Sequence, residues 1–591
     1  MLCAVEVLSY LQEINVADNK LQSLTEIFNE KFFRIPDFQR GYSWGQEQLD
    51  DFWEDLTNLK NDSIHYTGLL TIEPIKSSSV EKIEQWQDDL WLFERGFGAY
   101  YLIDGQQRLT TSIILINELL NKFGDNEGIN FSTKKDWEKK FLFQTYDESY
   151  KSYIFGYEKD NPSDEYFKTK ILDQESSTSD KVPEQTLYTA NLKRAKEYFS
   201  IELSKLNNKE LQSIFKKVTS KFKYNLYEID SDLDIYVTFE TMNNRGKPLS
   251  NLELLKNRLI YLSTLLDIDE SIRMRLRKDI NETWKTIYEY LGKNKNNTMD
   301  DDEFLRNHWI MYFKYDRKES ASYAKYLLNK KFTAKKAINN DLDFDEIKNY
   351  IDSLSKSVKS WFYLFNPQYS VYTDETKEWL QKLNRIGMSA FPPLFMASMT
   401  KCSEEEFLPL LKCSEKFIFL VFRLSQRPSN TKNSHFYRLA NSFYFGKNDT
   451  TIESTIENIE WLTVGEDDDD NYHGWFDLDK FYNYIKDLHT KGEGFYSWNG
   501  LRYFLFEYEL SLQDKAHGNV KLEWSDFNKR KKENSTNIPL NNETIPSALN
   551  ATVKKKLITT NISFLPVSFD SGSTPFTTIK FLSTLFLALK S

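Results

Sequence analysis

The chain has 591 residues, of which 40% are hydrophobic and 15% aromatic, and this composition excludes an intrinsically disordered protein. We expect several domains, because a single hydrophobic core stops growing at roughly 250 to 300 residues. The 77 Lys and Arg against 88 Asp and Glu give a net charge of −11, which excludes a protein that holds nucleic acid through an overall positive field. Any DNA contact must therefore use a local basic patch.

Targeting and redox features favour a cytoplasmic protein. The three cysteines Cys3, Cys402 and Cys413 have no paired spacing, which argues against a disulfide framework and against a zinc site and favours buried thiols. The opening stretch MLCAVEVLSYLQEI carries Glu6 and lacks a basic leader, so it predicts an amphipathic helix and not a signal peptide. The longest apolar run, at 581–589, is half the length of a membrane span, and we expect no membrane insertion.

The first part of the chain alternates strands and helices. Residues 47–61 repeat Leu and aromatic side chains at helical spacing, whereas residues 66–75 and 99–104 are typical of strands. A helix is expected to open near Leu109. Further along, the pattern predicts a helical stretch at 185–222, a strand at 223–229 and a helix at 232–243.

From about residue 250 to 510 the pattern changes to long amphipathic helices, with aromatic side chains three or four residues apart that we assign to the core. The acidic run at 465–470 lacks the spaced ligands of a calcium loop and predicts a solvated loop. We therefore expect an α+β protein in which a mixed domain precedes a large, mostly helical region. The expected domains are 1–230, 231–510 and 511–591.

Five polar residues, DGQQR (104–108), separate a predicted strand from a predicted helix. A helix N-terminus offers unpaired backbone N–H groups and the positive end of its dipole to an anion. Asp104 is suited to Mg²⁺ or a water, Gly105 allows close backbone approach, and Arg108 offers a planar fork to phosphate oxygens. Gln106 and Gln107 are suited to positioning a water or a base edge, and Thr110 to capping the helix or touching phosphate. The alternative is a buried polar turn without a ligand.

Two other stretches contain further polar residues suited to binding a nucleotide. RIPDFQRGYSW (34–44) places Gln39 and Arg40 beside aromatic side chains, a combination able to hydrogen-bond and stack on a nucleobase. In TFETMNNRGKPLSNLELLKNRLI (238–260), Ser250 and Glu253 predict a capping box at the start of a helix. Asn243, Arg245 and Lys256 are then polar groups on a rigid support, although Lys256 is equally explained as a solvated helix lysine.

IPDFQRGYSW (35–44), DGQQRLTT (104–111) and MNNRGKPLSNLELLKN (242–257) are called here the first, second and third motifs. In order and spacing they resemble the domain of unknown function 262, the N-terminal half of GmrSD-type modification-dependent restriction enzymes. The resemblance covers about residues 15–320, including DDEFLRNHWIMYF at 301–313. It implies a fold related to the ParB and sulfiredoxin superfamily, and a domain that binds or hydrolyses a nucleoside triphosphate to control DNA cleavage in anti-phage defence.

The resemblance also implies a site. The nucleotide-binding residues are Gln39, Arg40, Gly105, Gln106, Thr110, Asn243, Arg245 and Lys256, and the catalytic residues are Asp104, Gln107 and Arg108. Asp104 is assigned to Mg²⁺, and Arg108 to phosphate charge. The expected partners are a nucleoside triphosphate and DNA, including modified phage DNA, and a homo-oligomer is left open.

Relatives of this kind commonly end in a His-Asn-His nuclease whose histidine is a general base beside a metal. Residues 494–510 resemble the helix before that motif, and the basic cluster at 528–532 is where DNA would arrive. No histidine follows His517, and His473 and His489 lie too early to serve. The last 35 residues hold 12 Ser or Thr and only three charged side chains, so one hypothesis is a reading-frame shift near Ser535 that has removed the nuclease motif.

Three functions remain in competition. The first is an NTP-dependent, modification-sensing endonuclease of the defence type, here with its regulatory half. The second is a module that binds nucleotide or modified DNA without hydrolysis and recruits a separate nuclease. A structural scaffold is the third, and it gives no reason for three polar motifs on turns.

Overall fold

The fold was analysed in a computed structural model of the chain. It describes residues 21–60, 62–75, 84–125, 127–146, 151–159, 161, 163–174, 186–229, 249–294, 298–320, 322–465, 473–491, 497–515 and 524. The chain forms two compact units, one of Met1–Phe422 with Arg427–Phe476 and one of Arg423–Gln426 with Asp477–Ser591. The expected boundary near residue 230 and most of the expected third domain lie outside the described residues, so the predicted domain limits stay a prediction.

The first unit opens with a six-stranded mixed sheet in the order β1-β10-β3-β4-β2-β9. Its strands are β1 (Leu21–Ser23), β2 (Lys31–Ile35), β3 (His65–Pro74), β4 (Gly98–Asp104), β9 (Phe155–Tyr157) and β10 (Phe222–Glu228). Strand β4 runs parallel to β2 and antiparallel to β3, and β2 is also parallel to β9. Two small ribbons pair β5 (Gly128–Ile129) with β6 (Ser132–Thr133) and β7 (Phe143–Thr145) with β8 (Lys151–Tyr153).

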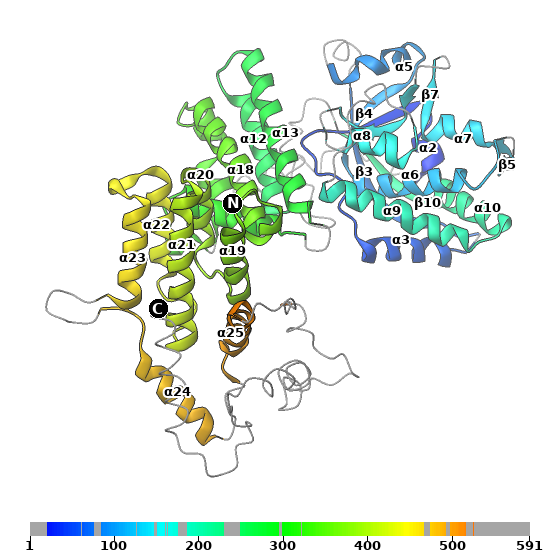
Figure 1. The fold of residues 1–591 in the computed structure, drawn as a ribbon. Coiled ribbons are helices and arrows are strands. Elements are labelled where there is room, and N and C mark those ends of the chain that lie inside the picture. The colour runs from blue at the N-terminus through cyan, green and yellow to red at the C-terminus, as the bar shows by residue number, and fades with distance from the viewer. Residues whose placement is uncertain are drawn as a thin grey trace. The chain divides into compact units, whose positions relative to one another are not determined.

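Helices lie beside this sheet (Figure 1). They are α2 (Leu24–Ile27), α3 (Gln46–Asn58), α5 (Leu90–Glu94), α6 (Gln106–Leu120), α7 (Lys134–Phe141), α8 (Asp164–Tyr166), α9 (Leu187–Ser204) and α10 (Asn208–Lys216). Helix α6 is nearly all buried and packs against α9, because its apolar side chains Ile113–Ile116 continue around the helix and leave no polar face. The core of this part therefore surrounds the helix that follows the second motif.

The rest of the first unit is helical. It contains α12 (Asn251–Leu265), α13 (Glu270–Gly292), α14 (Asp301–Tyr312), α15 (Arg317–Ser320), α16 (Tyr323–Tyr326), α17 (Ala334–Ile338), α18 (Phe344–Phe365), α19 (Asp374–Ile386), α20 (Pro392–Lys401), α21 (Glu404–Phe417), α22 (Asn433–Phe445) and α23 (Ile452–Val464). The second unit contributes α24 (Leu478–Thr490) and α25 (Leu501–Lys515). Trp284, Phe304, Trp309 and Phe313 are buried, which confirms the expected aromatic core, whereas Tyr312 is half-buried.

The α+β class is confirmed in its coarse form, a mixed sheet with helices followed by a helical region. The predicted strands at 66–75, 99–104 and 223–229 are present as β3, β4 and β10. The helix predicted at 232–243, the opening stretch of the chain and the acidic run after Gly465 lie outside the described residues. Within the described part, no helix is long and apolar enough to span a membrane.

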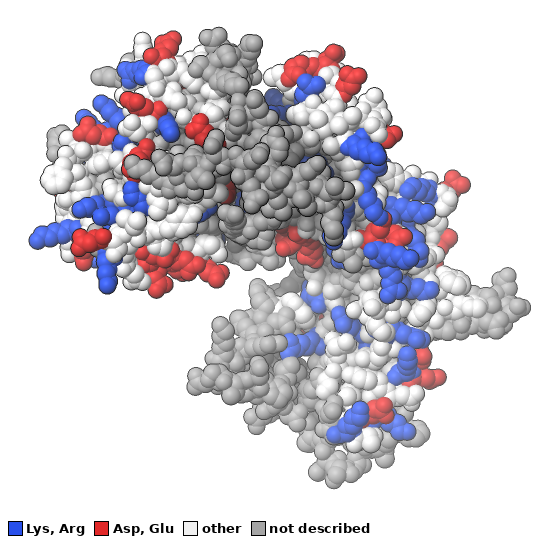
Figure 2. Space-filling view, turned by 180° about the vertical axis from the view of Figure 1, so that it is seen from behind, with Lys and Arg blue, Asp and Glu red and all other residues white. Residues whose placement is uncertain are grey.

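The surface carries charges of both signs. On the face in Figure 2, acidic side chains lie among the basic ones over the described parts. This mixture agrees with the net charge of −11, and the local DNA-binding patch stays a prediction.

Candidate functional site

The second motif forms a tight turn between β4 and α6. Gly105 has φ +88 and is the N-cap of α6, which begins at Gln106, three residues earlier than the sequence predicts. A Cβ at Gly105 would lie 2.3 Å from Leu70 Cδ2, so both the backbone conformation and the close approach of β3 require glycine. Asp104 Oδ1 accepts the Gly105 N–H at 2.7 Å. The half-buried carboxylate of Asp104 thus sits directly before the N-terminus of a buried helix.

The first motif folds against the end of the same strand. Gln39 Nε2 donates to the carbonyl oxygens of Leu102 at 2.7 Å and Ile103 at 2.9 Å. These two acceptors fix the orientation of the amide, because only its NH₂ group, and not its oxygen, can donate to them. Gln39 Oε1 is buried and, like Gln106 Oε1, has no hydrogen-bond partner among the described residues. Two buried acceptors beside Asp104 therefore remain for donors from a ligand or water.

Gln107 joins the two motifs. Its Oε1 accepts the Ser43 N–H at 2.7 Å, and its Nε2 donates to the Gly41 carbonyl oxygen at 3.1 Å. Tyr42 and Thr111 add a hydroxyl contact of 2.7 Å between the same segments. Gln107 therefore holds the first motif in place, and its side-chain amide is engaged by backbone at both ends.

Arg108 reaches across β3. Its Nη1 donates to the Thr67 carbonyl oxygen at 2.9 Å and its Nη2 to that of Leu69 at 3.0 Å. Between them lies Gly68, with φ +127, where a Cβ would be 1.6 Å from Arg108 Nη1. A guanidinium has five N–H donors and these contacts use two. Thr110, two residues further along, is buried and hydrogen-bonds the Tyr157 hydroxyl.

The third motif contributes a capping box and a buried lysine. Ser250 and Glu253 cap α12 as the sequence predicts. Glu253 also accepts the Tyr188 hydroxyl at 2.7 Å and lies 3.5 Å from Arg40 Nη1. Lys256 is buried, and its Nζ donates to the carbonyl oxygen of Asp37. The alternative of a solvated lysine is therefore wrong, whereas Asn243 and Arg245 lie outside the described residues.

Buried charges surround this lysine. Burial, and then the charge of Arg277, lower the pKa of Lys256 to about 8 against the attraction of Asp37. Burial would raise the pKa of Asp37, but the charge and hydrogen bonds of Arg277 hold it below its usual value. Burial and the charge of Asp37 raise the pKa of Glu158 to about 7. This concentration of perturbed groups is a physical sign of a functional site, although ion-pair networks produce it too.

Comparison with known protein families adds to this geometry. Residues 24–260 match the GmrSD restriction endonuclease N-terminal domain. No curated protein was found to match the chain. The match supports a GmrSD-type N-terminal domain that contains the three motifs, and it ends before the stretch at 301–313 that the resemblance was expected to include.

Within this GmrSD-type domain, the structure brings together Gln39, residues 104–108 and, through Asp37, Lys256. Arg40 lies at Glu253 of α12. Asp104 is a single carboxylate, which suits Mg²⁺ because this ion commonly takes one or two carboxylates with phosphates and water. No group of three or more His, Cys, Asp or Glu side chains is placed to hold a metal ion in the described part of the chain.

Sequence reasoning missed four residues of the hydrogen-bond network around Asp37, in which Tyr101 acts through Glu158. Arg277 and Asn281 come from α13, and Tyr101 and Glu158 come from β4 and the residue after β9. They lie between 57 and 244 residues from the groups that they bind, so no local pattern announces them. The only sequence signal for this network was the first motif itself, in which Asp37 lies between Pro36 and Gln39.

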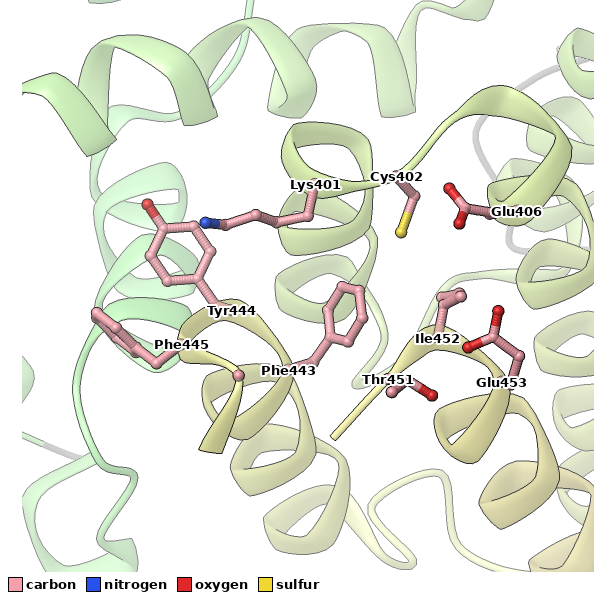
Figure 3. Close-up of a pocket in the computed structure, with 10 residues that line it drawn as sticks. Lys401, Cys402, Glu406, Phe443, Tyr444, Phe445, Thr451, Ile452 and Glu453 are labelled. Atoms are coloured by element: carbon pink, nitrogen blue, oxygen red, sulfur yellow. The ribbon is translucent and has the colours of Figure 1, made fainter. Parts of the chain in front are cut away.

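A pocket of about 520 Å³ lies away from the motifs, among the ends of α20 to α23 (Figure 3). It is lined by Lys401, Cys402, Glu406, Phe443, Tyr444, Phe445, Gly446, Thr451, Ile452 and Glu453. Burial and the nearby carboxylates of Glu406 and Glu453 raise the pKa of Cys402 to about 11, so its thiol is protonated at neutral pH. Cys402 is half-buried and Cys413 is buried, which agrees with inert thiols.

The nuclease question falls largely outside the described residues, which include neither His517 nor residues 525–591. His473 is exposed and stacks on Trp461 at 5.8 Å between ring centroids. Of the two interpretations that the sequence leaves open, a surface or a core histidine, the exposed position agrees with the first. The frame-shift hypothesis and the basic cluster at 528–532 stay predictions.

Proposed function

We propose that the chain is an NTP-dependent restriction-type protein of anti-phage defence that senses DNA modification, and that the nucleotide binds at the turn between β4 and α6. The supporting observation is the meeting of the motifs at one place. Gln107 ties the second motif to the first, and Lys256 of the third motif binds the backbone of the first, within a segment that matches a GmrSD-type domain.

In this proposal the residues divide the work by their chemistry. The N-terminus of α6 faces phosphate with its unpaired N–H groups, and Gln39 and Gln106 accept hydrogen bonds from the base, the ribose or a water. Asp104 would hold Mg²⁺, which supplies Lewis-acid charge neutralisation at the phosphates when bound. Arg108 contributes positive charge next to that site, and Thr110 supports the first turn of α6.

Phosphate release from ATP, GTP, CTP and UTP with Mg²⁺ tests the proposal. The full chain should hydrolyse at least one of them, and Asp104→Ala should lower turnover by about 100-fold, the size typical when one charge-stabilising group is lost. Asp125→Ala is the matched control, because Asp125 is an exposed carboxylate whose contact is a surface ion pair of 3.6 Å with Lys134. Normal turnover by Asp104→Ala would refute the assignment.

The proposed binding to DNA is tested separately. We expect binding of the full chain to duplexes that carry modified bases, and a comparison with unmodified duplexes of the same sequence measures the selectivity. Nucleotide binding without phosphate release would favour the non-hydrolysing module that recruits a separate nuclease. Sequencing the gene beneath residues 535–591 would reject the frame-shift hypothesis if no nuclease-like frame lies there.

A further inference from the structure

One side chain in the first motif is held by a helix from beyond the GmrSD-type domain. The Asp37 carboxylate accepts Arg277 Nε at 3.0 Å, Arg277 Nη2 at 2.6 Å and Asn281 Nδ2 at 2.7 Å. Both donors belong to α13, whereas the matched segment ends at residue 260. The bidentate contact fixes the direction as well as the position of the carboxylate.

The backbone of Asp37 is held as well. Its N–H donates to Glu158 Oε2 at 2.7 Å, and its carbonyl oxygen accepts Lys256 Nζ. Every polar group of this one residue therefore has a partner, and the partners come from three separate segments of the chain. A carboxylate that served only to balance charge would not need its own backbone fixed from both sides.

Asp37 lies two residues before Gln39 in a tight turn. The Gln39 N–H donates to the Pro36 carbonyl oxygen at 3.1 Å, so the turn brackets Asp37. At the end of that turn, the side chain of Gln39 reaches the carbonyl oxygens of Leu102 and Ile103, directly before Asp104. A shift of Asp37 would therefore move Gln39 relative to the second motif.

We propose that Arg277 and Asn281 are positioning residues for the nucleotide site, an inference that rests on the proposed function. By holding Asp37 they hold Gln39 against the end of β4, beside Asp104. The site thus extends past the GmrSD-type domain into α13, a helix that packs on α12 and α18. Neither residue touches the nucleotide, and both act through Asp37.

Kinetics of Arg277→Ala, Arg277→Lys and Asp37→Asn in the full chain test the proposal. Arg277→Ala should raise KM for the hydrolysed nucleotide about 10-fold and change kcat less than about 3-fold, because a displaced Gln39 weakens binding. Arg277→Lys should recover part of the loss, since it restores the charge without the bidentate geometry. Affinity for N-methylanthraniloyl derivatives of ATP and GTP should change in parallel with KM.

The matched control is Arg275→Ala, an exposed arginine on the same helix. Melting temperatures of all variants separate misfolding from displacement. The double variant Arg277→Ala with Asp37→Asn should have a KM no higher than that of the more impaired single variant, because the two groups act as a unit. Additive losses, or an Arg277→Ala variant with the KM of Arg275→Ala, would overturn the proposal.

Hydrogen exchange keeps this inference separable from the proposed function. In Arg277→Ala the amides of residues 37–41 should exchange faster than in the unsubstituted chain, and in Arg275→Ala they should not. Unchanged exchange in Arg277→Ala would reject the role of α13, whatever the nucleotide data. The two proposals can fail separately. If the unsubstituted chain bound no nucleotide but the exchange in Arg277→Ala changed as expected, the proposed function would be wrong. The stabilisation of residues 37–41 by α13 would still be supported.

Discussion

Two places in the described part of the chain bury titratable side chains in opposite ways. Around the first motif, Asp37, Lys256 and Glu158 are buried together, with Arg277 from the edge of the cluster. In the helical region His308 is buried alone among aromatic rings, with Tyr312 and Tyr350 at 5.6 and 5.2 Å between ring centroids. In the first place charged side chains are stabilised by partners of opposite charge. In the second place the buried histidine, His308, is neutral.

The difference follows from what each place must do. A buried ion is costly unless it is paired and hydrogen-bonded, so a fold retains such a cluster mainly where charge or precise geometry is needed. His308 needs only its Nε2 contact of 2.9 Å with Ser353 Oγ, and burial lowers its pKa to about 3. It is a neutral core residue. The comparison teaches that burial of a single titratable group is no sign of a site, whereas burial of several interacting charges is one of its physical signs.

The two αL glycines at helix ends provide the largest contrast. We expect Gly105→Ala to lower the free energy of unfolding by about 3–4 kcal/mol, from αL strain plus overlap with Leu70 and the Leu69 carbonyl. Gly446→Ala should cost only about 1 kcal/mol, since its φ is +62 but nothing lies within 4 Å of the added Cβ. Urea unfolding of both variants measures the difference. Equal losses would mean that the turn before α6 is not closely packed.

Acid should act on the helical region through His308. Its folded pKa, about 3, lies below the ordinary 6.5, so only the unfolded chain gains the proton between these values. Stability is therefore lost as the pH falls from 6.5 towards 3, at about 1.4 kcal/mol per pH unit. We compare the free energy of unfolding of His308→Phe with that of the unsubstituted chain. The advantage of the variant should be about 3 kcal/mol larger at pH 4 than at pH 7. A pH-independent difference in urea unfolding would contradict this.

The opposite sign is expected at Glu158. Its folded pKa, about 7, lies above the ordinary 4.5, so the folded chain keeps a proton that the unfolded chain releases. The stability contributed by Glu158 is fully present below pH 4.5 and is lost as the pH rises through 7. Glu158→Gln should match the unsubstituted chain at pH 4 and exceed it by about 3 kcal/mol at pH 7.5.

The Glu158→Gln test depends on the amide keeping the two contacts of the carboxylate. The Asp37 N–H and the Tyr101 hydroxyl both donate to Glu158, and an amide oxygen also accepts. Unfolding free energies across pH 4 to 7.5 check the prediction. A variant that is less stable by the same amount at every pH would show that the pKa of Glu158 is not raised by folding.

Local elements of the fold could be predicted from the sequence. The strands β3, β4 and β10 have the expected alternation and aromatic content, and the capping box of Ser250 and Glu253 has the expected spacing. The start of α6 was misplaced by three residues, since Gln106 and Gln107 look like loop residues. In the structure they are buried in the first turn, which a sequence pattern based on polarity does not indicate.

The meeting of the motifs could be predicted only in part, because the motifs are local in sequence but the contacts between them are not. The closeness of Gln39 to Asp104 depends on β2 lying beside β4, a pairing between strands that are more than 60 residues apart. Arg277 lies in the run RMRLRK, which in sequence is typical of a solvated basic face. Its contact with Asp37 comes from tertiary packing, and only the folded chain contains that information.

Arg108 and Gly68 have a consequence for how this protein can change in evolution. The guanidinium occupies the space where any side chain at position 68 would begin, so the two positions are not independent. A larger residue at 68 becomes tolerable only after Arg108 has been replaced or has turned away. Among related chains, we expect the two positions to vary together, with arginine at one requiring glycine at the other.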